Sequence, residues 1–513
     1  MAAVVPFRGS RVLAEWGAQR QQQRAATDKY PLPGGRRIPR PYRAAAQDRL
    51  TASWFAGRQS INDELRGDLD ALRDRARDTA RNNAYARKFL KMVARNVVGP
   101  KGFVLQSRVM NAPDQPDSLA NNAVELGFFN WCKRGSADIT GRLTFNDLCR
   151  ALMRGIARDG EALVCIVRGA EARNPEGLAY QLLDVARLDT ARNRSAASGL
   201  PAIVLGVEID AYQRPLGYWI KSRPDAASSS AVRYPASDIL HLFVPEEAEQ
   251  LRGRPWMHAA MLDTHDLGEF NRSALLAARK GANTLGYIVS PTGEAPPGEH
   301  DEDGTPLDIS VPGEYQVLPD GYDIRTPESA FPNTAYDPFV KAILRRIASG
   351  LDVSYNSLAN DLEGVNFSSI RAGVLEERDE WAQLQNWFID AFLEPVFDEW
   401  FPRAMTAGTL LMPNGSPLPV AKAAKFSAHE WQGRRWQWVD PLKDIDAARQ
   451  AIRTGIASPQ MIAAQNGVDV EDVLRGIAAF EAMAKSLGVQ AVNLQDSKAS
   501  TPAADAPVSP PLP

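Results

Sequence analysis

Apolar positions recur every three to four residues over several long stretches of the chain, and this spacing predicts amphipathic helices. The first stretch covers residues 61–97 and ends at Gly99, a residue type that commonly stops helices. Shorter helices are predicted over 118–134 and over 144–158, where Thr144 is a candidate N-cap. The N-terminal part of the chain is therefore expected to be helix-rich.

The period changes between residues 161 and 244, where short apolar runs of the β type follow one another. The runs are "EALVCIVR", "LAYQLLD", "IVLGVEID", "PLGYWI" and "ILHLFV". The polar hexapeptide "DAYQRP" separates the third run from the fourth and predicts a hairpin turn. This block is expected to be a mixed α+β unit with a mostly antiparallel sheet.

Two further amphipathic helices are predicted on either side of a Pro-, Gly- and acid-rich segment. The apolar stripe of the first, over 256–280, holds Trp256, Ala260, Leu267, Phe270, Ala274 and Ala278, and is broken by Asp263. The second helix begins near Asp337, a candidate cap, and has two faces. Its apolar face holds Val340, Ile343, Leu344, Ile347 and Leu351, and its cationic face holds Lys341, Arg345 and Arg346. The segment between the helices has short strand candidates at 285–289, 307–311 and 314–318.

A polar stretch, "SYNSLANDLEGVNFSSIRAG" (354–373), follows the second of these helices and is expected to be a loop. Its Ser-Ser pair is a candidate cap for a long helix from about 368, which is expected to kink or end near Pro395. Residues 440–488 have a helical pattern, in which Ser458 and Pro459 start a short helix.

Composition and charge narrow the class of protein. With 513 residues and 44% hydrophobic content, the chain is long enough for several buried cores, but it has no apolar run of about 18 residues and no signal-peptide pattern. Cys132, Cys149 and Cys165 are few and widely spaced, which favours reduced thiols in a cytosolic product. Residues 1–50 hold ten Lys/Arg and three Asp/Glu, so of the totals of 59 and 62, residues 51–513 hold 49 and 59. This acidic body does not favour tight binding of nucleic acid.

The usual catalytic motifs are absent from the sequence, including the P-loop, the dinucleotide-binding glycines, the GxSxG elbow and HExxH. His258 and His265 lie two turns apart and suggest a metal site as one alternative, but carboxylates at i+3 or i+4 do not stand beside each of them. The carboxylates Asp352, Asp361 and Glu363 suggest a two-metal nuclease as an alternative.

An aromatic cluster near the end of the acidic body leaves two interpretations open. It consists of Trp431, Trp436 and Trp438 with Arg434 and Arg435. These residues either stack on bases or pack at a domain or subunit interface. The basic segment 1–50 is either a solvated tail or an arm that docks on a partner.

Several stretches, in this order, resemble the portal proteins of tailed bacteriophages, specifically their lambda-like branch. They are "ARNNAYARKFLKMVARNVVGPKGFVLQS", "RDGEALV", "LLDVARL", "GVEIDAYQRPLGYWI", "HLFVPEEAEQLRGRPWMHAAM", "SLANDLEGVNFSSIRAG" and "WVDPLKDIDAARQAIRTGIASPQMIAAQNGVDVEDV". Together they span most of residues 60–490, outside the basic arm and the Pro-rich tail. Another capsid-associated assembly factor remains an alternative class.

The resemblance implies an α+β, helix-rich portal fold that assembles into a closed ring, typically a dodecamer, at one capsid vertex. The implied parts are a flexible basic arm (1–50), a wing (51–255), stem helix 1 (256–283), a β-containing clip (284–335), stem helix 2 (336–352), a tunnel loop (353–367), a long helix returning to the wing (368–438), a helical crown (439–492) and a disordered tail (493–513).

The resemblance also implies the function, which is to form the channel for DNA packaging and ejection, without catalysis, cofactor or metal. Implied partners are double-stranded DNA, the terminase large subunit, the head–tail connector, and the major capsid and scaffold proteins, with no membrane. The location is the virion, after assembly in the host cytoplasm. The candidate tunnel-loop residues are Asn360, Asp361, Glu363 and Asn366, and the candidate tunnel-lining stem residues are Lys341, Arg345 and Arg346.

Overall fold

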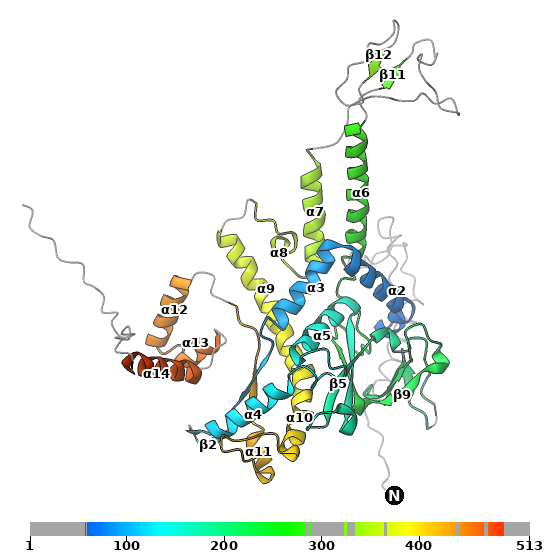
Figure 1. Ribbon diagram of the computed structural model, residues 1–513. Coiled ribbons are helices and arrows are strands. Elements are labelled where there is room, and N and C mark those ends of the chain that lie inside the picture. The colour runs from blue at the N-terminus through cyan, green and yellow to red at the C-terminus, as the bar shows by residue number, and fades with distance from the viewer. Residues whose placement is uncertain are drawn as a thin grey trace, which may run out of the picture. The chain divides into compact units, whose positions relative to one another are not determined.

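A computed structural model describes residues 57, 59–113, 115–197, 199–283, 287–289, 323–325, 334–363, 367–436, 441–465 and 470–486. The chain divides into two compact units, Met1–Gln59 and Ser60–Pro513, and the elements below belong to the second (Figure 1). The predicted basic arm (1–50) and Pro-rich tail (493–513) lie outside the described residues. No helix in the described ranges is both long and apolar enough to cross a membrane.

The helical stretch predicted over 61–97 is two helices, α2 (Ile61–Asn82) and α3 (Ala84–Val97). Asn83 separates them because its backbone is extended and its side chain caps α3, accepting hydrogen bonds from the backbone N–H groups of Tyr85 and Ala86. Helix α4 is Ser118–Trp131 and α5 is Phe145–Asp159. The predicted cap at Thr144 is confirmed as a capping box with Asp147.

The block 161–244 forms two antiparallel sheets, as the sequence predicts. In the first, β4 (Glu161–Arg168) lies between β10 (Ile239–Phe243) and β5 (Leu178–Leu183). The second has the order β6 (Ala202–Val204), β7 (Val207–Ile209), β8 (Pro215–Ile220) and β9 (Val232–Pro235). The predicted hairpin turn joins β7 to β8, where the Asp210 carboxylate accepts from the N–H groups of Tyr212 and Arg214 at 2.8 Å each. Helix α5 packs on β4.

The main core is built by segments far apart in the sequence. Helix α9 (Phe367–Phe388) runs through a π-helical turn (Ile389–Leu393) into α10 (Glu394–Ala407), so the break predicted near Pro395 is confirmed. Large aromatic side chains from α4 and α10 meet here, and the rings of Phe128 and Trp400 are 5.0 Å apart, edge to face. Strand β1 (Val104–Ser107) pairs with β13 (His429–Gln432), which ties the end of this region to its start.

Several smaller elements complete the described residues. Strands β2 (Met110–Ala112) and β3 (Gln115–Pro116) pair beside α4, and α11 (Ala423–Phe426) precedes β13. The C-terminal helices are α12 (Pro441–Arg453), α13 (Pro459–Gln465) and α14 (Val470–Ser486). They agree with the helical pattern of 440–488, and the Ser458 hydroxyl accepts from the N–H of Met461 at the start of α13.

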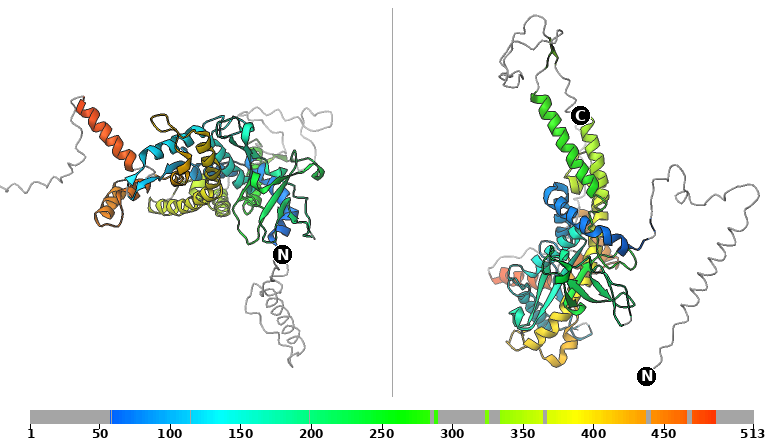
Figure 2. Two further views of the ribbon diagram at one scale, coloured as in Figure 1. Left: turned by 90° about the horizontal axis from the view of Figure 1, so that it is seen from below. Right: turned by 90° about the vertical axis from the view of Figure 1, so that its right-hand side faces the viewer.

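The two helices that flank the acid-rich segment are α6 (Met261–Asn283) and α7 (Tyr336–Ser349), which run side by side (Figures 1 and 2). Helix α6 begins later than predicted, because residues 256–260 form a turn. The apolar stripes are confirmed, since Leu267 and Ala274 of α6 and Leu344 and Ile347 of α7 are buried. The expectation that Asp337 caps α7 is wrong: the N-cap is Ala335, and Asp337 lies inside the first turn.

Only short parts of the segment between these helices are described. Strands β11 (Tyr287–Val289) and β12 (Asp323–Arg325) pair antiparallel. The strand candidate at 285–289 is therefore confirmed in part, whereas β12 was not predicted. The candidates at 307–311 and 314–318 lie outside the described residues.

Candidate functional site

The polar stretch after α7 is partly a helix, which corrects the expectation of an open loop. Residues Tyr355–Ala359 form α8, whose N-cap Ser354 accepts a hydrogen bond from the N–H of Ser357. Leu358 is 1% exposed and packs in the main core, and α8 contacts both α7 and α3. The burial of Leu358 thus contributes to holding α8 in place, which the polar composition of the stretch did not reveal.

The first turn of α8 is also fastened to α9. The hydroxyls of Ser354 and Ser357 donate to one oxygen of Glu377, at 2.8 and 3.0 Å, and the indole N–H of Trp381 donates to the other. The Ser-Ser pair predicted to cap the long helix does not do so, because α9 already begins at Phe367. The candidate Asn366 lies outside the described residues.

Beyond α8 the chain turns back towards α7. Asn360 has a left-handed backbone (φ 57°), and its amide oxygen accepts from the ammonium of Lys88 on α3. Lys341 of α7 forms ion pairs of 2.8 Å with both Asp337 and Glu363 and lies 3.9 Å from Asp361. The loop candidates Asp361 and Glu363 are therefore brought together around one cation of α7.

Tyr355 completes this cluster. Its hydroxyl donates to Asp361 at 2.6 Å, which lowers the pKa of that carboxyl. Burial, with the hydrogen bond to Asp361, raises the pKa of Tyr355 to about 12. The guanidinium of Arg345 lies over the Tyr355 ring, 5.3 Å from its centroid. Arg346 instead turns towards α6 and pairs with Asp263, the residue that breaks the apolar stripe of that helix.

The alternative sites gain no support from the geometry. Asp352 is exposed, and Asp361 and Glu363 are engaged with Lys341; across the described ranges there is no group of three or more metal-ligating side chains. His258 contacts the carbonyl of Pro255 through its Nδ1, and His265 is exposed.

The aromatic cluster divides between two environments. Trp431 packs against Phe128, with ring centroids 5.4 Å apart, as the packing interpretation expects. Trp436 lies near two guanidinium groups, those of Arg378 at 6.0 Å and Arg434 at 5.7 Å. Trp438 lies outside the described residues.

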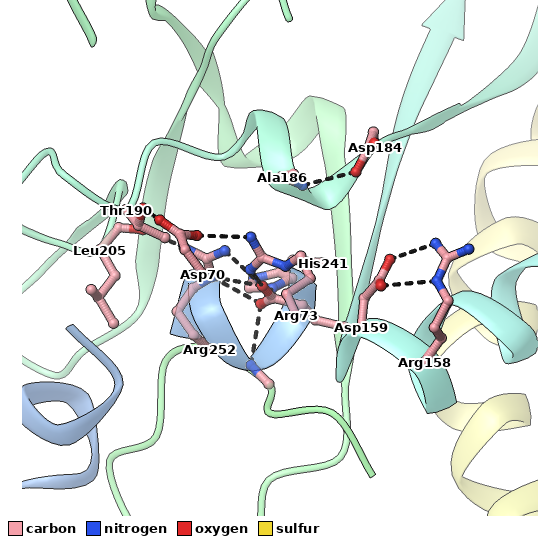
Figure 3. A network of polar contacts seen from close by, with 12 residues as sticks. Asp70, Arg73, Arg158, Asp159, Asp184, Ala186, Thr190, Leu205, His241 and Arg252 are labelled. Carbon is pink, nitrogen blue, oxygen red and sulfur yellow. Dashed lines mark hydrogen bonds and ion pairs between the residues drawn. The ribbon is translucent and has the colours of Figure 1, made fainter. Parts of the chain in front are cut away.

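A buried ionic network was missed by sequence reasoning (Figure 3). Glu161, at the start of β4, is fully buried and accepts from Arg252 at 2.6 and 2.9 Å, from Arg73 of α2 at 3.0 Å and from His241 of β10 at 2.8 Å. The backbone N–H of Gly253 donates to it as well. The available signal was a carboxylate directly before the apolar run of residues 162–167.

The network determines which groups are charged. Burial acts to raise the pKa of Glu161, but the charge of Arg252 and the hydrogen bonds from His241 and Arg252 outweigh it and hold that pKa well below its usual range. Arg73 and Arg252 are 1% and 0% exposed, so each depends on this carboxylate for compensation. The network joins α2 and both β4 and β10 to the segment that leads into α6.

Comparisons of the sequence with known proteins agree on one family. The model of the family "Phage portal protein, lambda family" matches residues 47–385. A probable portal protein of Halomonas phage phiHAP-1 is 34% identical over 466 residues, covering 88% of each chain. Portal protein B of Escherichia phage lambda is 20% identical over 464 residues, covering 82% of this chain and 85% of that protein. Among solved structures, a chain in the neck of an empty GTA particle has a TM-score of 0.43 and 14% identity, covering 78% of this chain and 93% of that chain.

The matched residues 47–385 include both sheets, the α6–α7 pair, α8 and most of α9. These matches define a structural component of a phage particle. The chain belongs to the lambda family of phage portal proteins.

Proposed function

We propose that this chain forms a closed ring, typically of twelve copies, at one vertex of a capsid and that double-stranded DNA is packaged and ejected through the ring. In this role it takes part in procapsid assembly with the major capsid and scaffold proteins. The segment 284–335 is the clip, which docks the terminase large subunit during packaging and later the head–tail connector. Residues 439–492 form the crown.

The observation that carries this proposal is the state of the α6–α7 pair. Each helix buries one apolar stripe against the other, yet Leu262, Leu275 and Leu276 of α6 remain 69%, 54% and 57% exposed. Leucines this exposed on a regular helix are typical of a surface that another chain covers. Repetition of one such heterologous contact around an axis closes a ring.

The loop cluster supplies the candidate contacts with DNA. Asp361 and Glu363 sit beside Lys341, so their negative charge is partly compensated within the chain. A polar, nearly neutral constriction repels and attracts phosphates only weakly, which suits a channel that must let DNA slide. We assign Asn360, Asp361, Glu363 and Asn366 to this constriction and Lys341, Arg345 and Arg346 to the adjoining stem wall.

The proposal is tested by the assembly state of the purified chain, measured by native mass spectrometry and negative-stain imaging. The wild-type chain is expected to form closed rings. The variant Leu262→Glu/Leu276→Glu is expected to lose them, because both positions lie on one outer face of α6. The control, Tyr212→Glu/Val232→Glu, places the same charges at 81% and 61% exposed sites in and beside the β6–β9 sheet and should assemble normally. A wild-type chain that stays monomeric at all concentrations contradicts the proposal.

A further inference from the structure

A cationic cleft lies beside the loop cluster, on its α3 side. It has a volume of about 350 Å³ and is walled by α3, α8, α9 and the segment that ends at Trp436. Its lining includes Lys88, Arg95, Ser357, Arg378, Trp381 and Trp436. The cleft is continuous with the candidate loop, because Asn360 of the loop also lines the cleft and accepts a hydrogen bond from Lys88.

Arg378 lies near the carboxylate of Asp444, whereas the other cations in or beside this cleft have no such partner among the described residues. Within the described part of the chain, no carboxylate lies within ion-pair distance of Lys88, Arg95 or Arg434. The Arg434 guanidinium donates instead to neutral acceptors, the backbone carbonyl of Arg95 and the side chain of Asn96. Glu377 lines the cleft, but its oxygens already accept from two serines and a tryptophan.

The cations also lie close enough to repel one another. Burial and the neighbouring charge of Arg95 lower the pKa of Lys88. Burial, together with Arg95 and Arg378, lowers the pKa of Arg434. An anion entering the cleft would relieve this repulsion. The ring of Trp436 lies near two of the guanidinium groups, those of Arg378 and Arg434.

We propose that this cleft binds phosphate groups of the double-stranded DNA that passes the neighbouring loop. The inference rests on the proposed function, and it adds a binding site on the wing to the loop and stem contacts assigned above. Guanidinium and ammonium groups are the side chains that hold phosphate oxygens. DNA is favoured over an acidic protein segment because Lys88 and Asn360 link the cleft directly to the loop assigned to the channel. A few such contacts in an acidic body guide DNA without holding it tightly.

The test compares two variants of the full-length ring. Lys88→Gln/Arg95→Gln removes two cations of the cleft, and Arg87→Gln/Lys91→Gln removes two exposed cations of the same helix that do not line it. Both variants change the net charge equally. The affinity for a fluorescein-labelled 30-base-pair duplex of random sequence is measured by anisotropy between 50 and 200 mM NaCl, with ring integrity followed by native mass spectrometry.

The cleft variant is expected to make the negative slope of log K against log salt shallower by about 1.8 for each copy whose cleft contacts the duplex, because each phosphate contact contributes roughly 0.9. The control should keep the wild-type slope. Equal slopes for wild type and cleft variant, or no duplex binding by wild type at 50 mM NaCl, overturn the inference while leaving rings and the portal function intact. If the cleft variant loses its rings and the slope is unchanged, the cleft binds an acidic segment of the neighbouring copy instead of DNA. This result also overturns the inference. A wild-type chain without rings removes the proposed function itself.

Discussion

Arg73 of α2 has two carboxylate partners that differ in burial, and this makes the energetic role of the buried network measurable. Glu161 is 0% exposed and Asp70 is 62% exposed, while Arg73 itself is 1% exposed. Among the described residues, Glu161 carries the only negative charge in direct contact with both Arg73 and Arg252, and Glu161→Gln removes this charge. The substitution also places an amide N–H group, itself a donor, among side chains that donate hydrogen bonds. Asp70→Asn removes a partner that water can replace.

The expected magnitudes follow from burial. Removing one partner of a buried ion pair leaves an uncompensated charge and lowers the free energy of unfolding by about 3–5 kcal/mol. Loss of a solvent-exposed pair lowers it by about 0–1 kcal/mol. Glu161→Gln should therefore destabilise the protein several times more than Asp70→Asn, although each substitution removes a single negative charge beside Arg73 (Figure 3).

The assay is urea unfolding of the two variants and wild type under one condition, followed by tryptophan fluorescence. The fluorescence reports on the core because Trp131 and Trp400 are buried in it. A loss below about 1 kcal/mol for Glu161→Gln, or equal losses for the two variants, would refute the reasoning that Glu161 compensates buried charges.

Three further outcomes are expected. The stability difference between wild type and Glu161→Gln should be constant from pH 6 to 9 and shrink only below about pH 4. A carboxyl with a lowered folded pKa contributes stability above its unfolded pKa of about 4.3 and loses this contribution as the pH falls towards the folded value. A stability difference that disappears above pH 6 would contradict this. Gly160→Ala should lower the free energy of unfolding by at least about 2 kcal/mol, since Gly160 has φ 88° and an added Cβ would overlap the backbone of Arg254. Gly155→Ala, in the middle of α5 where an added Cβ meets no other atom, should raise the free energy of unfolding by up to about 1 kcal/mol. Urea midpoints of the two variants measure the sign of each change. Deleting residues 361–366, beyond the buried part of α8, should leave rings intact in native mass spectra and reduce the length of DNA retained in particles; full-length packaged DNA would exclude the assigned role of the loop.

Periodicity in the sequence predicted the elements that have a strong apolar pattern. The stripes of α6 and α7, the cap at Thr144 and the break near Pro395 are local features, and each has a local physical cause. The end of a helix was less predictable where a side chain of the helical stretch itself caps the backbone N–H groups of a new helix. Asn83 interrupts 61–97 because its side chain caps a new helix, which a stripe of apolar residues does not show.

The sequence located the candidate site, but it did not predict the contacts between the residues of that site. The polar stretch after α7 was recognised, yet α8 within it depends on the burial of Leu358 by helices distant in the sequence. The pairing of Lys341 with Glu363 depends on how the chain turns back after Asn360. The Glu161 network is equally non-local, because its cations come from positions 88 and 91 residues away. Such contacts follow from tertiary packing, which spacing along one chain does not encode.

The central claim, that DNA passes through a ring of these chains, is tested most directly by an electron cryo-microscopy reconstruction of one vertex of DNA-filled particles. The account predicts a ring at a single vertex, with α6 and α7 arranged around the axis and residues 361–363 of every copy beside the DNA density. A ring absent from the vertex, or one in which these residues face away from the axis, would contradict it.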